Sequence, residues 1–380
     1  CVTLSGADPH SFRPLKVGAN LGSADLFRSH PSAGSPYLCA MKLVTYLSQN
    51  VERLGLVAAD RIVDLERAHA AARDRGDVRL GCASLPNDML GFLRGGEQSM
   101  ADARTVMSWF LVADHATQET VSVPHASATL CAPVPHPTSM RDGYAFRQHV
   151  EAARRNRGVE MIPEFDQIPI FYFTNHQAVF GPGPVHVQRL QNDKLDFELE
   201  CAIVIGKQGR NIKAAEADSY VAGLMVMNDW SARTLQMLEM KLNLGPAKGK
   251  DFATTLGPWL VTLDELADRT TSTPVGNQYD LDMRCVINGT EVSRGNVKDM
   301  TWTFAQIIER ASYGVTLYPG DVIGSGTCGT GCFLELNGSK VYDPAWWLKP
   351  GDVVTCSIDR LGDLENTVVL SDEDNTALMY

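Results

Sequence analysis

From residue 41 onward, hydrophobic and polar positions follow clear periods. MKLVTYL (41–47) alternates as a strand does, and RLGLVAADRIVDL (53–65) predicts two short strands around a turn. Between about residues 65 and 114 the apolar positions follow a helical period, which predicts helices over 65–75 and 100–112. Ser99 is the expected N-terminal cap of the second helix. The pattern predicts a small α/β domain at 41–125.

Beyond a proline-punctuated passage at 121–137, short strands with turn signals predominate. The predicted strands are 169–173, 195–205, 281–288, 321–325, 332–336 and 353–358, and the predicted helices are 213–220, 231–238 and 304–312. Strands and helices do not alternate regularly, which excludes a doubly wound parallel sheet and indicates the α+β class.

The first 40 residues differ from the rest of the chain. They are rich in Ser, Gly and Pro, begin with Cys1 and show neither period. We expect a disordered tail, or a stretch added upstream of a native start at Met41. The predicted organisation is therefore a tail at 1–40, a small N-terminal domain at 41–125 and a larger β-rich domain at 126–380.

Charge and composition narrow the function. Lys and Arg number 34 against 45 Asp and Glu, a net charge of −11 in 380 residues. An acidic surface disfavours nucleic acid and anionic membranes as partners, and no apolar run approaches the ~18 residues of a membrane span. Nine cysteines without a framework spacing favour reduced thiols and a cytoplasmic location. An anionic substrate would then need a local basic cluster.

The segment LDFELE (195–200) is the sharpest chemical feature. If it is one strand, Asp196, Glu198 and Glu200 share a face, with neighbours roughly 6–7 Å apart. Aligned carboxylates repel one another unless something positive lies between them. The alternative is an acidic strand edge that faces solvent, but the apolar CAIVIG that follows favours an interior strand.

A second motif is NDWSARTLQ (228–236). Treated as a helix from its first turn, it places Asp229, Arg233 and Gln236 at i, i+4 and i+7, on one stripe. The alternative is an ordinary surface ion pair. The apolar AGLMVM before the motif indicates instead that the stripe emerges from the core.

Two further segments supply possible acid–base and cationic groups. RDGYAFRQH (141–149) contains Asp142, Tyr144 and His149, each of which could equally be structural. GPAKGKDFATT (245–255) places Lys248 and Lys250 on a Gly- and Pro-containing loop. This loop is either the basic cluster that an anionic substrate needs or a solvated lysine loop.

The order of these motifs is itself informative. DxYxxxxH is followed by ELE, by MNDWSAR with a Gln three residues on, by GPxxGK and by a Gly-rich GSGT, over about residues 140–361. This order resembles the fumarylacetoacetate hydrolase family, in its bacterial-type branch. The resemblance implies a rolled, mixed, β-rich sheet in a catalytic C-terminal domain, and a homodimer.

The resemblance also implies site residues. The divalent-cation ligands would be Asp142, Glu198, Glu200 and Asp229. An all-carboxylate shell favours Mg²⁺, with Ca²⁺ or Mn²⁺ as alternatives, over zinc. His149 would be the general base, and Lys250 and Arg233 would stabilise negative charge on the substrate. The substrate contacts would be Tyr144, Tyr172, Gln236 and Thr327, together with Arg233 and Lys250.

Two departures from the family pattern affect the catalytic base. The Gly-rich segment GTCGTGCFLEL offers no Glu before Glu335 to orient His149, so the orienting partner is missing or comes from elsewhere. In another branch a Glu follows the His by three residues on a lid helix, whereas Glu151 follows His149 by two. A literal GxGxxG at 324–329 is rejected as a nucleotide site because the FLEL after it reads as a strand.

Three functions stay open, of which the resemblance implies the first two. The first is hydrolytic C–C cleavage of a β-diketo acid of the fumarylacetoacetate or acylpyruvate type, by water that His149 activates and with an enolate stabilised by the cation. The second is decarboxylation or keto–enol isomerisation of an oxaloacetate-like acid. The third is a calcium-dependent binding module without catalysis. In the first two the partner is a small anionic keto acid.

Overall fold

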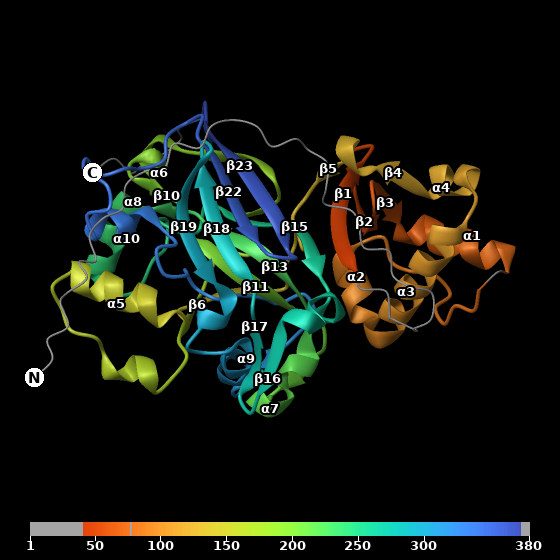
Figure 1. Cartoon of the computed structure of the whole chain (residues 1–380), viewed down its shortest axis with the longest axis horizontal. Helices are drawn as coiled ribbons and strands as arrows, with labels where there is room; N and C mark the ends of the chain where they lie inside the picture. Colours follow the sequence, from red (N-terminus) through yellow and green to blue (C-terminus); the bar gives the residue numbers. More distant parts are fainter. Residues whose placement is uncertain (1–40, 77, 374–380) are drawn as a thin grey trace, which may run out of the picture. The chain divides into compact units, whose positions relative to one another are not determined.

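A mixed sheet runs through the computed structural model, which describes residues 41–76 and 78–373 (Figure 1). The strands are, in spatial order, β4 (Ser122–Pro124), β3 (Arg61–Asp64), β2 (Val51–Ala58), β1 (Lys42–Ser48), β15 (Thr254–Val261), β13 (Val221–Asp229), β11 (Leu199–Ile205), β21 (Val322–Gly324), β6 (Met140–Gly143) and β7 (Phe171–Phe173). Outside this path, β5 (Thr129–Leu130) pairs with β1 and β8 (Val179–Phe180) pairs with β15. The predicted tail at 1–40 lies outside the described residues.

A second sheet covers one face of the first. It contains β19 (Thr290–Asn296), β18 (Asp282–Ile287), β22 (Val353–Ile358), β23 (Gly362–Leu370) and β9 (Gly183–Val187), in that order. Cys201 and Ile203 of β11 pack in one core with side chains of this sheet, whereas Ala202 and Val204 pack in the other core, with the N-terminal part of the chain. Strand β11 is therefore buried on both faces, which explains its unbroken apolar sequence.

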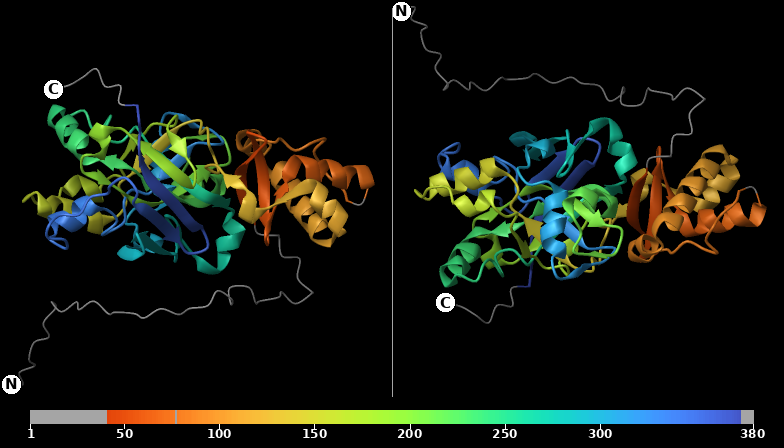
Figure 2. Two further views of the ribbon diagram at one scale, coloured as in Figure 1. Left: turned by 90° about the horizontal axis from the view of Figure 1, so that it is seen from above. Right: turned by 90° about the horizontal axis from the view of Figure 1, so that it is seen from below.

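The N-terminal part joins the large sheet directly. Strand β1 pairs antiparallel with β15, with Leu43 opposite Leu260. Helices α1 (Leu65–Arg75), α3 (Gly96–Val112) and α4 (His115–Val121) lie on one side of β1–β3, as the two views of Figure 2 show, with α2 (Met89–Arg94) before α3. Strands from both sides of residue 125 thus share one sheet, and the division into two domains there stays a prediction.

Most of the predicted elements are present, and the α+β class with a large mixed sheet is confirmed. Helices 65–75 and 304–312 have the predicted bounds, as α1 and α9 (Phe304–Ser312). Helix α3 begins at Gly96 rather than residue 100, so Ser99 is buried inside it and Gly95 takes the cap position. The cap was misplaced because α2 runs almost directly into α3.

Three predictions near the site were wrong in detail. The strand predicted at 332–336 is helix α10 (Phe333–Gly338). The strand predicted at 195–205 is two strands, β10 (Leu195–Asp196) and β11. The helix predicted at 231–238 is α8 (Arg233–Glu239). Asp229, which the stripe of Asp229, Arg233 and Gln236 placed on a helix, is instead the last residue of β13, and the short β14 (Ser231–Ala232) lies between.

Seven other α-helices and strands complete the regular structure of the described residues, apart from short 3₁₀ turns. They are α5 (Arg147–Asn156), α6 (Arg189–Asn192), α7 (Ala214–Ala217), β12 (Gly209–Arg210), β16 (Thr270–Thr273), β17 (Gly276–Tyr279) and β20 (Thr316–Leu317). Among residues 41–76 and 78–373, no helix has both the length and the apolar character needed to cross a bilayer.

Candidate metal centre and active site

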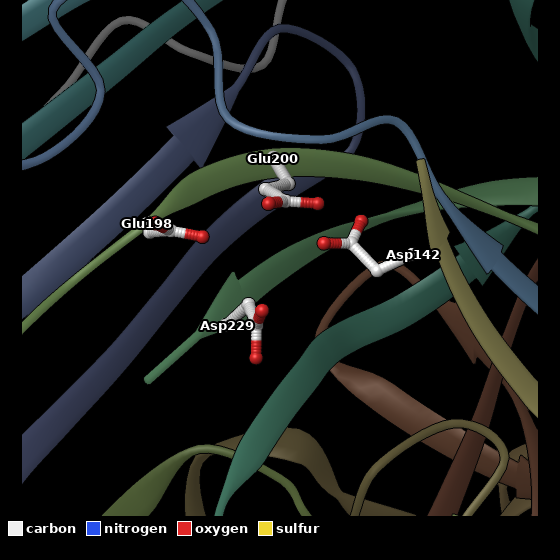
Figure 3. A group of neighbouring side chains, drawn as sticks. All are labelled: Asp142, Glu198, Glu200 and Asp229. Carbon is white, nitrogen blue, oxygen red and sulfur yellow. The ribbon is translucent and has the colours of Figure 1, made fainter. Parts of the chain in front are cut away.

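Four carboxylates meet at one end of the central strands (Figure 3). Asp142 comes from β6, Glu200 from β11, Asp229 from the end of β13, and Glu198 from the residues just before β11. One oxygen from each lies within 4.8 Å of those of the others, and all four side chains are buried. The structure therefore brings together the four residues that the sequence predicted as cation ligands.

The order of strands explains how they meet. Strand β21 lies between β11 and β6, with Gly324 opposite both Asp142 and Ala202. A Cβ atom at Gly324 would lie 2.5 Å from Oδ1 of Asp142. The absence of a side chain at Gly324 therefore lets the Asp142 carboxylate occupy the space over β21, toward Glu200 on the strand beyond.

The Gly-rich segment also donates to the cluster. The amide of Gly326 donates to Oδ1 of Asp142 (3.1 Å) and to Oε2 of Glu200 (3.0 Å). Gly326 adopts a φ of 80°, which favours glycine. Thr327 Oγ1 lies 3.4 Å from Oε1 of Glu200. Helix α10 follows the 324–329 segment, so the reason given for rejecting a nucleotide site there was wrong. The Gly326 amide nevertheless donates to carboxylates, which leaves it unavailable to a phosphate.

The cluster carries more negative charge than its neighbours compensate. Burial and then the charge of Asp229 raise the pKa of Asp142 to about 7. Burial and then the charge of Asp142 raise the pKa of Glu200 well above its ordinary value. Burial acts to raise the pKa of Glu198 too, but Lys250 and Arg233 outweigh it and hold that pKa below its ordinary value. Burial raises the pKa of Asp229 as well. Without a cation, Asp142, Glu200 and Asp229 therefore favour the protonated form, and Glu198 favours the charged form.

The donor set fits a hard divalent cation. Oδ1 of Asp229 is buried and has no hydrogen-bond partner among the residues that the structure describes. Such an orphaned carboxylate oxygen is costly unless it has a positive partner. Carboxylate oxygens are the ligands that Mg²⁺, Ca²⁺ and Mn²⁺ prefer, whereas zinc favours nitrogen and sulfur.

The two predicted cationic residues bind the carboxylates themselves. Lys250 Nζ donates to Glu198 Oε2 (2.5 Å) and to Asp229 Oδ2 (2.7 Å). Arg233 Nη2 donates to Glu198 Oε1 (2.8 Å), and its Nη1 donates to Gln236 Oε1 (2.9 Å). Tyr172 OH donates to Asp229 Oδ2 (2.7 Å). Lys250, Arg233 and Tyr172, which were predicted as substrate contacts, therefore bind the carboxylates of the cluster, and Gln236 binds Arg233.

The expected basic patch for an anionic substrate is thus smaller than predicted. Lys248 is exposed and pairs with Asp251 (2.9 Å), and Lys250 and Arg233 already have carboxylate partners. Any substrate anion at this site must share these cations with the protein's own acids, or find its positive partner in a bound cation.

His149 has the orienting partner that the sequence did not reveal. His149, on α5, is buried, and its Nδ1 lies 2.6 Å from Oε2 of Glu335 on α10. The other Glu335 oxygen accepts from the amide of Thr330 (2.9 Å). Tyr144 meets the His149 ring edge-on, at 5.8 Å between centroids. Glu151, by contrast, lies at the surface and accepts from Arg147.

Tyr144 links His149 to the carboxylate cluster. It follows Asp142 by two residues and meets the His149 ring edge-on. A Cβ atom at Gly326, whose amide donates to the cluster, would lie 2.9 Å from the Cα of Tyr144. The site therefore combines a buried carboxylate cluster with an imidazole held by a carboxylate, which suits proton transfer to and from a bound acid.

Comparison with known proteins agrees with this site. The profile of the fumarylacetoacetate (FAA) hydrolase C-terminal family matches residues 138–369. The chain belongs to the fumarylacetoacetate hydrolase family. Within this family it is 32% identical over 290 residues to the rat oxaloacetate tautomerase Fahd2a, mitochondrial, covering 75% of this chain and 81% of the relative. It is 34% identical over 288 residues to the human oxaloacetate tautomerase FAHD2A, mitochondrial, with the same coverage of 75% and 81%.

A solved structure shares the fold. Fumarylacetoacetate hydrolase from Exiguobacterium antarcticum superposes with a TM-score of 0.62 at 22% identity, covering 87% of this chain and all of the other. This structural likeness confirms the predicted rolled mixed sheet as the fold of this chain. The assignment to a bacterial-type branch stays a prediction.

Sequence reasoning missed the contact of Glu335 with His149 and misplaced Asp196. Glu335 was passed over because it lies at the end of the Gly-rich segment, where no Glu precedes it, and the orienting partner was taken as missing or supplied from elsewhere. Asp196 was placed on the face of the cluster, but the break between β10 and β11 turns it toward Arg233 and α10.

Proposed function

We propose that this chain is a divalent-cation-dependent tautomerase that interconverts the keto and enol forms of a 2-oxo dicarboxylic acid of the oxaloacetate type. The observation that carries the proposal is the buried cluster of Asp142, Glu198, Glu200 and Asp229, together with the His149–Glu335 pair that Tyr144 contacts. The names of the rat and human relatives, at 32% and 34% identity, favour tautomerisation over hydrolysis.

The four carboxylates would hold the cation. A cation held there would polarise the 2-oxo group of the substrate and stabilise the charge of an enolate. Mg²⁺ is the ion we expect, with Mn²⁺ and Ca²⁺ as alternatives.

His149 would move the proton. Its Nδ1 is held by Glu335, so Nε2 is the atom that exchanges a proton with the substrate. Nε2 would take a proton from C3, and the electrons of that C–H bond would form the C2–C3 double bond while the π electrons of the C2 carbonyl move to its oxygen. The imidazolium would then give its proton to that oxygen. Glu335 would stabilise the imidazolium between these two transfers.

A second candidate is the C–C hydrolysis predicted from the sequence. The His149–Glu335 pair favours it, because the same imidazole could take a proton from water that attacks a second carbonyl. Glu151 follows His149 by two residues rather than three, and this missing spacing counts against tautomerisation. The objection loses force because Glu335, and not Glu151, is the partner of His149. Decarboxylation would use the same enolate.

Product analysis separates these reactions. Purified protein with added Mg²⁺ would be incubated with oxaloacetate, fumarylpyruvate and acetylpyruvate, with Mn²⁺ and Ca²⁺ in parallel. Faster loss of the oxaloacetate enol absorbance without pyruvate release supports the tautomerase. Pyruvate from acylpyruvates identifies the hydrolase, and pyruvate from oxaloacetate identifies the decarboxylase. Cation binding without any turnover would support the binding module instead.

Location and assembly also stay proposals. The cytoplasmic location predicted from the cysteines is at odds with the names of the rat and human relatives, which describe those proteins as mitochondrial. The homodimer was predicted from the family resemblance and would be tested by light scattering of the purified chain.

A further inference from the structure

Asp196 contacts both Arg233, which binds the carboxylate cluster, and helix α10, which carries Glu335. Its side chain is 0% exposed, and it belongs to β10 rather than to the cluster. Its Oδ2 accepts from Arg233 Nε (2.7 Å) and from the amide of Leu334 (2.9 Å), and its Oδ1 accepts from the amide of Phe333 (2.7 Å). One buried carboxylate thus binds helix α8 and the start of helix α10.

On the α8 side, Asp196 acts on the cluster through Arg233. The guanidinium of Arg233 donates to Asp196 with Nε and to Oε1 of Glu198 with Nη2. The planar guanidinium fixes the direction of both bonds, because its donors form a rigid fork. The position of Glu198 therefore depends on where Asp196 holds Arg233.

On the α10 side, Asp196 acts on the base through Glu335. Helix α10 has six residues, and a helix this short needs contacts beyond itself. Its own cap is the thiol of Cys332, with the Glu335 amide 3.4 Å from Sγ, and cysteine is not among the preferred cap residues. Asp196 accepts from the amides of the first two residues of the helix, and Glu335 is the third residue of the same helix.

We propose that Asp196 is a positioning residue, which sets the His149–Glu335 pair relative to the carboxylate cluster through Arg233 and helix α10. It is directed at Arg233 and at backbone amides, and not into the carboxylate cluster. Its effect on turnover rests on the proposed function, whereas its effect on α10 and on cation affinity does not.

Asp196→Asn is the direct test. The amide keeps the size and one acceptor oxygen but loses the charge that faces Arg233. Residues that support metal ligands from outside typically cost about 10- to 100-fold in activity or metal affinity when changed. We expect a loss of kcat in this range with little change in KM, because no substrate contact is removed.

Asp64→Asn is the matched control. Asp64 is also buried, caps helix α1 by accepting from the Arg67 amide (3.0 Å) and binds Arg53, far from the site in sequence. It should lower thermal stability as Asp196→Asn does, while kcat stays at the wild-type value.

Two readouts do not depend on turnover. Hydrogen exchange of the peptide that covers 333–338 should be faster in Asp196→Asn and unchanged in Asp64→Asn. Mg²⁺ affinity, measured by calorimetry, should fall only in Asp196→Asn. If wild type turns over none of the oxo acids, the proposed function fails, and these two readouts still decide the role of Asp196.

A rescue variant covers the case of poor folding. Cys332→Ser gives α10 a hydroxyl cap of its own, so Asp196→Asn with Cys332→Ser should regain part of the protection of 333–338 and part of kcat. Asp196 positions nothing if Asp196→Asn has wild-type exchange at 333–338 and wild-type Mg²⁺ affinity. If the single variant does not fold, the same conclusion follows when the double variant matches Cys332→Ser alone in both measurements.

Discussion

Replacing Glu335 by Gln tests how the catalytic base is held. Glutamine keeps the length of the side chain and an oxygen that can accept from Thr330, but it removes the negative charge beside His149. If His149 carries a proton during the reaction, the loss of this charge raises the free energy of the imidazolium and slows the step.

The geometry sets the size of the effect. His149 Nδ1 and Glu335 Oε2 are 2.6 Å apart, and the two side chains are only 10% and 5% exposed, so water compensates little of the loss. A hydrogen bond with a charged partner contributes about 1.5–3 kcal/mol. At ~1.4 kcal/mol per factor of ten, kcat should fall roughly 10- to 150-fold.

The assay compares Glu335→Gln with Glu151→Gln. The rate of enol-to-keto conversion of oxaloacetate at saturating substrate and Mg²⁺ gives kcat for each variant. Glu151 is the nearer glutamate in sequence but lies at the surface against Arg147, so Glu151→Gln should match wild type. A wild-type kcat for Glu335→Gln, or an equal loss in both variants, would refute the reasoning.

Three further predictions concern the cation and the base. Asp229→Asn should abolish Mg²⁺ binding in calorimetry, because Oδ1 of Asp229 is the buried oxygen without a protein partner among the described residues; an unchanged binding isotherm would contradict this. Mg²⁺ should raise the melting temperature more at about pH 8 than at about pH 6. The pKa of Asp142 is raised to about 7, so at the lower pH the cation must displace a proton from this carboxylate; an equal shift at both pH values, or a larger one at pH 6, would contradict this. His149→Gln should bind Mg²⁺ as wild type does but lose turnover, and retained turnover would remove His149 as the base.

The fold was predictable where local pattern and packing agree. Helix α1 has its predicted bounds because Asp64 caps it and Gly76 ends it in a left-handed conformation, both strong local signals. Helix α10 was missed because its start is fixed by Asp196, 137 residues earlier in the chain, and by a weak thiol cap. No short sequence window contains that information.

The site was predictable as a set of ligands and not as a network. The four carboxylates could be named from their motifs, and the structure places them together. The binding of Arg233 and Lys250 to Glu198 could not be anticipated, because it depends on how α8 and the 245–250 loop fold over β11. Glu335 was set aside because it comes only at the end of the Gly-rich segment, although it is the only Glu there, and helix α10 is what brings it to His149.

The exchange of the C3 protons of oxaloacetate in D₂O tests the central claim most directly. Proton NMR would follow the C3 signal with metal-stripped protein, before and after Mg²⁺ is added, and with Asp229→Asn in parallel. We predict exchange at the buffer rate without Mg²⁺, a saturable acceleration as Mg²⁺ binds, and no acceleration by Asp229→Asn. Exchange at the buffer rate by wild-type protein whose Mg²⁺ binding is established by calorimetry would contradict the account.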